Sequence, residues 1–469
     1  MSFFSRIFGN KRTVKARYDV AQTTEENAAH WSMATDWTAD MEANHDVRKT
    51  IRSRSRYEIG NNPWLHGTIL QMAEDLVGTG PRLQVTGMDN QDEANAIERA
   101  FRRWARAVSL DAILRSAFTA EVMDGEAFIQ IGTNKNLSTP EKLDLLVFDC
   151  DRVMAPEKLT DTDTDRQADG VFFDDFGRPL RYAVAASHPG AGGLLQATRM
   201  IDARYIIHLY RRDRPEQHRG IPWLTPAFPS IILLRRYTLA MVKKMESSAN
   251  ISGVFESTEP DPSGDVNELE PWQKFSLPRD SFIATPRGWS FKQNTMQNPT
   301  ESQQNFAMQV KLEAGRCLLA PRNVVTGDSS NYNYSSGRLD FQAYDKAIRV
   351  LRSGLETVAL DRILAEWLGE HAPGMDVPEH IWYWDGRAHV DPVKEASAVL
   401  LSYQAGTLTQ MDACAAEGKD WQVETEQRYR EAAFHKEMEK KYNVTLENSN
   451  GRTDPTEDRT DNRADDGQS

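Results

Sequence analysis

The chain has 469 residues, of which 39% are hydrophobic and 27% are charged, and its formal net charge is −13. A chain of this length exceeds a single hydrophobic core, so we expect two to four domains. Tight phosphate binding needs clustered Lys and Arg, so the acidic balance excludes a protein that grips DNA tightly, although not one that lets DNA slide past. No apolar run reaches about 18 residues, which excludes a transmembrane helix and a membrane partner.

Both ends of the chain are predicted to lie outside the folded domains. Residues 1–44 begin with aromatic and basic residues but lack the apolar core and cleavage site of a signal peptide, so the chain is expected to stay in the host cytoplasm. We interpret them as a flexible arm, with a contact to nucleic acid or an acidic scaffold as the alternative. Residues 444–469 are strongly polar and are predicted to be disordered.

The segment from residue 46 to residue 219 is predicted to form one α+β domain. Ser109 is expected to cap a helix that Gly125 ends. The alternating aspartates of 161–170 resemble a calcium loop but lack its Gly and Glu, so we favour an exposed acidic loop. Helices are predicted at 46–56, 63–76, 93–106 and 110–124, and strands at 82–85, 127–132, 143–149, 171–175, 178–184 and 204–210.

Prolines precede an apolar helix that ends at Ala249. Its paired cations are interpreted as a solvated or subunit-facing stripe, with a face turned towards DNA as the alternative: Arg235, Arg236, Lys243 and Lys244. Residues 256–270 hold six acids and no Lys or Arg, which is typical of a surface loop. Strands are then predicted at 282–286 and 289–293, so a small acidic lobe interrupts two helices.

Two helical runs joined by a polar loop occupy residues 303–368. In the first run, four residues at spacings of three and four are predicted to share one face: Phe306, Val310, Ala314 and Cys317. Pro321 is expected to end that helix, and the Ser-, Asn- and Gly-rich stretch from Asn323 to Gly337 is predicted to be a mobile loop. The second helix, from Arg338 to Leu368, would span roughly 45 Å.

The C-terminal part predicts a short buried strand followed by helices. Trp382 and Trp384 mark the strand, and the helices are expected at 392–404, 410–416 and 421–442. Three cysteines, Cys150, Cys317 and Cys414, show no paired spacing, so neither a disulfide framework nor a zinc site is indicated. No phosphate-binding, zinc-protease or hydrolase motif is present, and we expect no enzyme, cofactor, metal or catalytic residue. A metal-dependent nuclease is the form of enzyme left to test.

Four segments in this order resemble the lambda-type portal proteins of tailed phages: Arg52–Val85, Arg199–Phe228, LLAPRNVVTGDSSNYNYSSGRLDF at 318–341, and Asp391–Thr409. The resemblance covers roughly residues 45 to 440. It implies a ring, usually of twelve subunits, that forms a channel at one vertex of the virion for DNA packaging and ejection. It also implies assembly in the host cytoplasm and these partners: the terminase large subunit, head–tail connector proteins, major capsid and scaffold proteins, and double-stranded DNA that passes non-specifically. The competing class is another assembly protein of the capsid or baseplate.

The same resemblance divides the chain into the parts of a portal subunit. It implies a wing at 45–225 with 369–390 returning, stem helices at 226–249 and 299–321, a clip at 250–298, a tunnel loop at 322–337, a tunnel helix at 338–368 and a crown at 391–443. The loop residues are Asp328, Ser329, Ser330, Asn331, Tyr332, Asn333, Tyr334, Ser335 and Ser336. They are expected to bond along a sliding duplex without a fixed partner.

Two further sets of residues complete the expected sites. Candidates to face DNA are Arg322, Arg338, Lys346, Arg235, Arg236, Lys243 and Lys244. The acidic clip residues are expected to bind the motor and the connector: Glu256, Glu259, Asp261, Asp265, Glu268 and Glu270. A channel lined mostly by acidic and neutral polar groups repels phosphate and lets DNA translocate.

Overall fold

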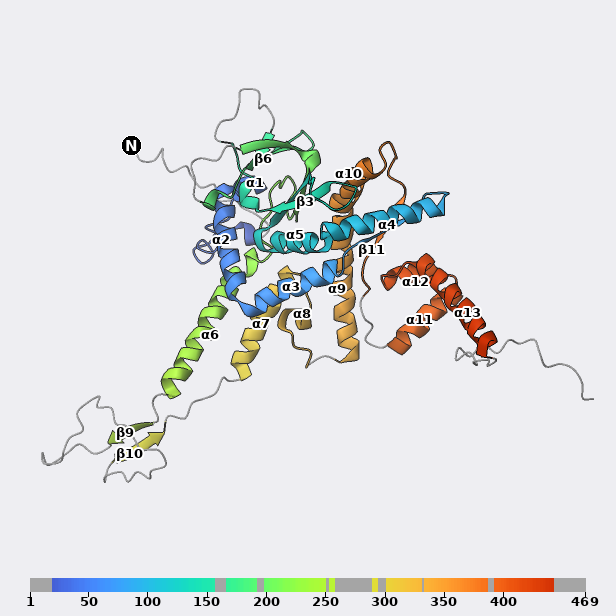
Figure 1. The fold of residues 1–469 in the computed structure, drawn as a ribbon. Coiled ribbons are helices and arrows are strands. Elements are labelled where there is room, and N and C mark those ends of the chain that lie inside the picture. Colours follow the sequence, from blue (N-terminus) through green and yellow to red (C-terminus); the bar gives the residue numbers. More distant parts are fainter. Residues whose placement is uncertain are drawn as a thin grey trace, which may run out of the picture. The chain divides into compact units, whose positions relative to one another are not determined.

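The computed structural model describes residues 19–156, 166–191, 198–249, 253–257, 289–293, 301–330, 333–386 and 392–442. The chain divides into two compact units, and each combines segments that lie far apart in the sequence (Figure 1). The first unit comprises Met1–Gly78 and Arg103–Val377, and the second comprises Thr79–Arg102 and Pro378–Ser469. No helix within the described ranges is long and apolar enough to cross a membrane.

The first unit begins with three helices: α1 (Ala39–Glu42), α2 (His45–Asn61) and α3 (Pro63–Val77). Proline at the first position of α3 suits the helix start, where an N–H has no intrahelical partner. Helix α1 belongs to the folded part, because Asp40 lies 2.7 Å from the His218 imidazole. The packed structure therefore begins before residue 45, whereas residues 1–18 of the predicted arm lie outside the described ranges.

Helices α4 (Gln91–Ala107) and α5 (Leu110–Asp124) match their predicted positions. The predicted cap at Ser109 is wrong in its chemistry, because this residue has φ 55° and its side chain makes no capping hydrogen bond. Gly125 ends α5 as expected. Its φ is 92°, and a Cβ there would lie 2.3 Å from the Ile221 carbonyl carbon, so only glycine fits.

Two antiparallel sheets follow in the first unit. The three-stranded sheet has the order β3 (Leu143–Phe148), β2 (Glu126–Thr133), β8 (Ile206–Tyr210), with Phe128 opposite both Phe148 and His208. The four-stranded sheet has the order β4 (Arg166–Ala168), β5 (Val171–Phe173), β6 (Pro179–Ala185), β7 (Thr198–Asp202). Strand β4 falls inside the predicted acidic loop at 161–170, the rest of which lies outside the described ranges apart from a turn at 169–170.

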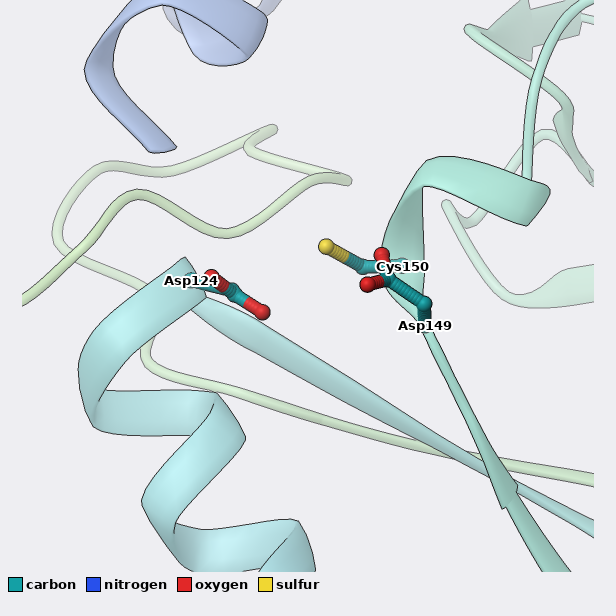
Figure 2. A group of neighbouring side chains, drawn as sticks. All are labelled: Asp124, Asp149 and Cys150. Atoms are coloured by element: carbon teal, nitrogen blue, oxygen red, sulfur yellow. The ribbon is translucent and has the colours of Figure 1, made fainter. Parts of the chain in front are cut away.

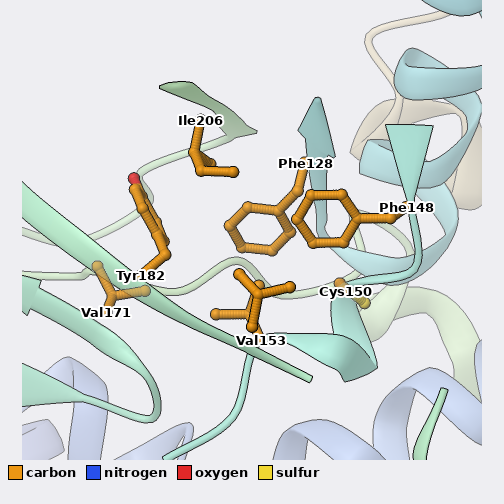
Figure 3. Packing of buried hydrophobic residues seen from close by; sticks show 8 residues of the cluster. Phe128, Phe148, Cys150, Val153, Val171, Tyr182 and Ile206 are labelled. Atoms are coloured by element: carbon orange, nitrogen blue, oxygen red, sulfur yellow. The ribbon is translucent and has the colours of Figure 1, made fainter. Parts of the chain in front are cut away.

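A hydrophobic cluster joins the two sheets (Figure 3). Phe128 stacks on Phe148 with ring centroids 5.7 Å apart, and it meets the Tyr182 ring edge to face at 5.8 Å. Such aromatic pairs add to the burial of their apolar area. The cluster comprises Phe128, Phe148, Cys150, Val153, Val171, Tyr182, Val184 and Ile206.

The rest of the first unit is mostly helical. Helix α6 (Phe228–Ala249) packs on α7 (Glu301–Cys317), and between them in the sequence lies the antiparallel pair β9 (Gly253–Ser257) and β10 (Trp289–Gln293). Strand β10 confirms one predicted strand, whereas the strand predicted at 282–286 lies outside the described ranges. Helices α8 (Arg322–Thr326), α9 (Tyr334–Leu355) and α10 (Asp361–His371) follow, and a π-helical turn at Glu356–Leu360 joins the last two.

The second unit contains the part of α4 up to Arg102, a two-stranded sheet and three further helices. Strand β1 (Arg82–Val85) pairs antiparallel with β11 (His380–Tyr383), which confirms the predicted strand around the buried Trp382. Helices α11 (Pro392–Gln404), α12 (Gln410–Ala416) and α13 (Trp421–Tyr442) have the predicted bounds. Thr409 and Asp412 form a reciprocal capping box at the start of α12.

Candidate functional site

The polar loop between α8 and α9 is shorter than the sequence suggests. The stretch from Asn323 to Gly337 was expected to be loop throughout, but α8 occupies its first part and α9 already begins at Tyr334. Asn333 explains the early start of α9. Its Oδ1 accepts the Ser336 amide at 2.8 Å while the Ser336 hydroxyl accepts the Asn333 amide at 3.1 Å, and this capping box offsets the weak helix propensity of the sequence.

Asp328 has fixed partners, contrary to the expectation from the sequence. Its carboxylate accepts the Ser330 amide at 2.9 Å and lies 3.6 Å from the Arg322 guanidinium. Hydrogen bonds from the Ser330 hydroxyl and amide lower the pKa of Asp328, so it stays charged at neutral pH. Asn331 and Tyr332 lie outside the described ranges, as does the side chain of Tyr334.

The helix before the loop is anchored to α3. The Thr68 hydroxyl donates a hydrogen bond to the Val325 carbonyl at 3.1 Å, and the Val325 side chain is buried. Gly315 of α7 permits this packing, because a Cβ there would lie 2.6 Å from a Val325 methyl group. Helices α7 and α8 thus approach closely beside α3.

The helix after the loop is anchored to the C-terminal end of α3. The buried Tyr344 hydroxyl donates to the Asp75 carboxylate at 3.0 Å. The Arg352 guanidinium donates to the backbone carbonyls of Leu76 at 2.8 Å and Asp75 at 3.0 Å. A cation at these orphan carbonyls is favourable, because they carry the negative end of the helix dipole. Both ends of the loop are therefore fixed to the same short helix.

Helices α6 and α7 pack on each other, and an ion pair joins α6 to α2. Phe306 contacts the Tyr237 ring at 6.4 Å but is 54% exposed, so the predicted shared face is buried only at Val310 and Ala314. Arg235 pairs with Glu58 at 3.3 Å and covers the Tyr57 ring. Helix α6 exposes three apolar side chains, Leu233, Leu239 and Val242, of which Leu239 and Val242 lie within about 60° of each other around the helix axis.

The cations predicted to face DNA fall into two groups. Arg235 and Arg322 are partly buried and make ion pairs within the subunit. The others have exposed side chains on α6 and α9: Arg236, Lys243, Lys244, Arg338 and Lys346. Of the predicted clip residues, Glu256 lies in β9, and Glu259, Asp261, Asp265, Glu268 and Glu270 lie outside the described ranges.

A buried ionic network was missed by the sequence reading. Arg219 donates to Glu126 at 2.6 Å, and Arg52 lies 3.5 Å from the same carboxylate and 2.5 Å from Asp151. Burial alone would raise the pKa of Glu126. The positive charge of Arg219 and hydrogen bonds from His208 and Arg219 instead hold this pKa well below its usual range. The signal was the four-residue spacing of the arginines on α2, which places Arg48, Arg52 and Arg56 on one face.

Two clusters of three side chains in this region have the composition of a metal site, but an arginine already neutralises their carboxylates. Figure 2 shows Asp124, Asp149 and Cys150 pointing toward one another, and Asp149 also neighbours Asp151 and His188. The Arg56 guanidinium already occupies the position of a cation, donating to Asp124 at 2.6 Å, to Asp151 at 2.8 Å and to Asp149 at 3.0 Å. Burial raises the pKa of the Cys150 thiol well above its ordinary value, so the thiol is protonated beside Arg56 at neutral pH.

Comparison with known proteins shows which family the chain resembles. A family model described as phage portal protein, lambda family, matches residues 24–352, more than half of the chain. The chain is 22% identical over 428 residues to a probable portal protein of Halomonas phage phiHAP-1, covering 81% of this chain and 80% of that protein.

Two of the similar solved structures come from gene transfer agent particles. One, the neck of an empty particle computed with C6 symmetry, has a TM-score of 0.49 and 15% identity and covers 78% of this chain and 93% of that chain. The other, the virion of a native particle, has a TM-score of 0.45 and 14% identity and covers 78% and 92%. On the extent of the family match, the chain belongs to the lambda family of phage portal proteins.

Proposed function

We propose that copies of this chain close into a ring, of about twelve subunits, whose axial channel passes double-stranded DNA during packaging and ejection. The observation that carries the proposal is the loop at 327–333, whose two flanking helices are both anchored to α3 in a chain of the portal family. A loop fixed at both ends can contact a moving duplex while its supports stay in place. The function is structural, and no catalytic step is assigned to the chain.

The arrangement of helices supports a portal subunit with separate parts. In this proposal α6 and α7 form the stem, β9 and β10 belong to the clip, and α9 with α10 forms the tunnel helix. The wing includes the two sheets, and α11 to α13 form the crown. The exposed apolar side chains of α6 would be covered by the adjacent subunit, because a head-to-tail interface closes into a ring when its rotation matches.

The proposal also assigns partners and a location. The ring occupies one vertex of the capsid, among major capsid and scaffold proteins, after assembly in the host cytoplasm. The terminase large subunit docks at the acidic clip and head–tail connector proteins later replace it, because rim charges set the rate and specificity of encounter. Charge reversal at Glu256 and the five other clip acids should weaken terminase docking while rings still form.

The loop provides the direct test of the channel assignment. Deleting Ser329–Tyr332 spares the Asn333 capping box, so α9 should still fold, and rings should still form while packaging or retention of DNA falls. Replacing Asp328 with Lys should slow translocation in a salt-dependent way, because each subunit would add a cation to the channel. Asp328→Asn is the matched control, since it removes the charge without adding a cation. Rings and wild-type packaging in the deletion variant would show that this loop lies outside the channel.

A further inference from the structure

Helix α4 carries a basic stripe on its exposed face. Four arginines stand at the helical spacings of three, four and seven residues, so all lie within about 100° of arc: Arg99, Arg102, Arg103 and Arg106. All four side chains are exposed, whereas Ala94, Ile97, Phe101 and Trp104 on the opposite face are buried. The helix geometry alone places these guanidinium groups side by side over two turns.

None of the four arginines makes a hydrogen bond or ion pair within the part of the chain that the structure describes. The acid beside them on α4, Glu98, is buried and its carboxylate accepts the Val85 amide at 2.8 Å. Other exposed arginines of this acidic chain do find carboxylates: Arg204 pairs with Glu366 at 2.7 Å and Arg430 with Glu426 at 2.6 Å. Four guanidinium groups without an ion pair therefore stand side by side on one helix face of a chain of net charge −13.

We propose that this stripe, Arg99 to Arg106 on α4, binds the phosphate backbone of double-stranded DNA without reading its sequence. Arginine presents a planar fork that matches two phosphate oxygens. The stripe is roughly 10 Å long at 1.5 Å per residue. That length covers about three phosphates of one strand at 3.4 Å each. Within the described residues, α4 exposes no large apolar side chain. Protein interfaces usually bury an apolar centre, so this surface fits DNA better than a protein partner.

The proposed binding of DNA by the stripe rests on the proposed function only because it requires the protein to meet DNA. The stripe and the channel loop are different segments with different roles. The stripe lies on α4, whereas the proposed channel residues lie on α6, α8, α9 and the loop after α8. In an acidic protein such a stripe supplies one local anchor for the duplex. The remaining surface repels it, so binding is weak and reversible.

The test measures binding of the purified full chain to a fluorescent 40-base-pair duplex across a series of salt concentrations. The variant R99Q/R102Q/R103Q/R106Q removes the stripe, and R428Q/K436Q/K440Q/K441Q removes four exposed cations from α13 as the matched control. Three phosphate contacts correspond to a salt slope of about −2.7 in log–log form. The stripe variant should lose most of that slope and roughly tenfold or more in affinity at low salt, while the control keeps both.

Two results would overturn the proposal. One is equal binding and slope for the stripe variant and the unsubstituted chain. The other is an effect of the stripe variant on binding to poly-glutamate but not to the duplex, which would assign the stripe to an acidic protein. Circular dichroism checks that the exposed substitutions leave the fold intact. Electron microscopy of the same samples scores rings separately, so failure of the ring proposal and failure of the stripe proposal remain distinguishable.

Discussion

Single residues mark the limit of what the sequence predicts here. Arginine ordinarily indicates a surface position, so the basic run at 46–56 was predicted as a helix but not as a buried one. Arg48 and Arg52 are 1% and 2% exposed. The partner of Arg219 is Glu126, 93 residues earlier in the chain, and local patterns carry no information on such a contact. Glu126 begins β2 and Arg219 lies in the loop after β8, so only the tertiary structure brings the two side chains together.

Loss of the Glu126–Arg219 ion pair should lower the free energy of unfolding substantially. Glu126→Gln keeps the side-chain volume but removes the main charged partner of the fully buried Arg219, which then keeps only the Asp169 carboxylate at 3.4 Å. Removing one partner of such a pair typically costs about 3–5 kcal/mol. The free energy of unfolding from urea denaturation checks this. Glu426→Gln, in the exposed pair with Arg430, is the control and should cost under about 1 kcal/mol. Equal costs for the two variants would contradict the importance of the buried network.

Glu121 should make stability depend on pH near neutrality. Burial raises the pKa of Glu121 to about 7, against the opposing effect of Arg211. Between the unfolded pKa of about 4.5 and pH 7 the folded chain holds more protons than the unfolded chain, so this group's contribution makes stability fall as pH rises through that window. Glu121→Gln should therefore stabilise the protein most above pH 7 and little below pH 5. A variant effect that does not change with pH would exclude the raised pKa.

Elements were predicted better than their ends and contacts. The helices at 392–404, 410–416 and 421–442 were predicted with the bounds that the structure has, because each has clear breaks on both sides. The loop before α9 was predicted too long. Its Ser and Asn residues read as loop formers, yet Asn333 and Ser336 use the same polar groups to cap the helix. The hydrogen bonds that hold α8 and α9 against α3 are tertiary contacts, and they were not predicted from the sequence.

The capping box at α9 predicts a local effect of substitution. Asn333→Ala removes the acceptor of the Ser336 amide, which typically costs about 1 kcal/mol. Backbone amides at 335–338 should then exchange hydrogen faster, while those near Tyr344, held by Asp75, should not change. Hydrogen–deuterium exchange with peptide resolution measures both regions. Ser335→Ala, at an exposed position outside the box, is the control, and unchanged exchange at 335–338 in Asn333→Ala would show that the box does not set the helix start.

At the scale of the whole molecule, the chain has the expected α+β composition and separates into two units that each draw on distant segments. The extended match to the portal family and the anchored loop converge on a subunit of a larger assembly. The exposed apolar side chains of α6 fit the same view. One isolated subunit cannot enclose a duplex, so the proposed channel requires several copies around an axis.

Imaging of the purified full chain without nucleic acid tests that claim most directly. Samples at micromolar concentration would be examined by cryo-electron microscopy, with the particle mass measured in parallel. We predict closed rings with an axial hole and a mass that is a multiple of the 53.1 kDa chain, close to twelve copies. A strictly monomeric mass across the concentration range, or assemblies without an axial opening, would contradict the account.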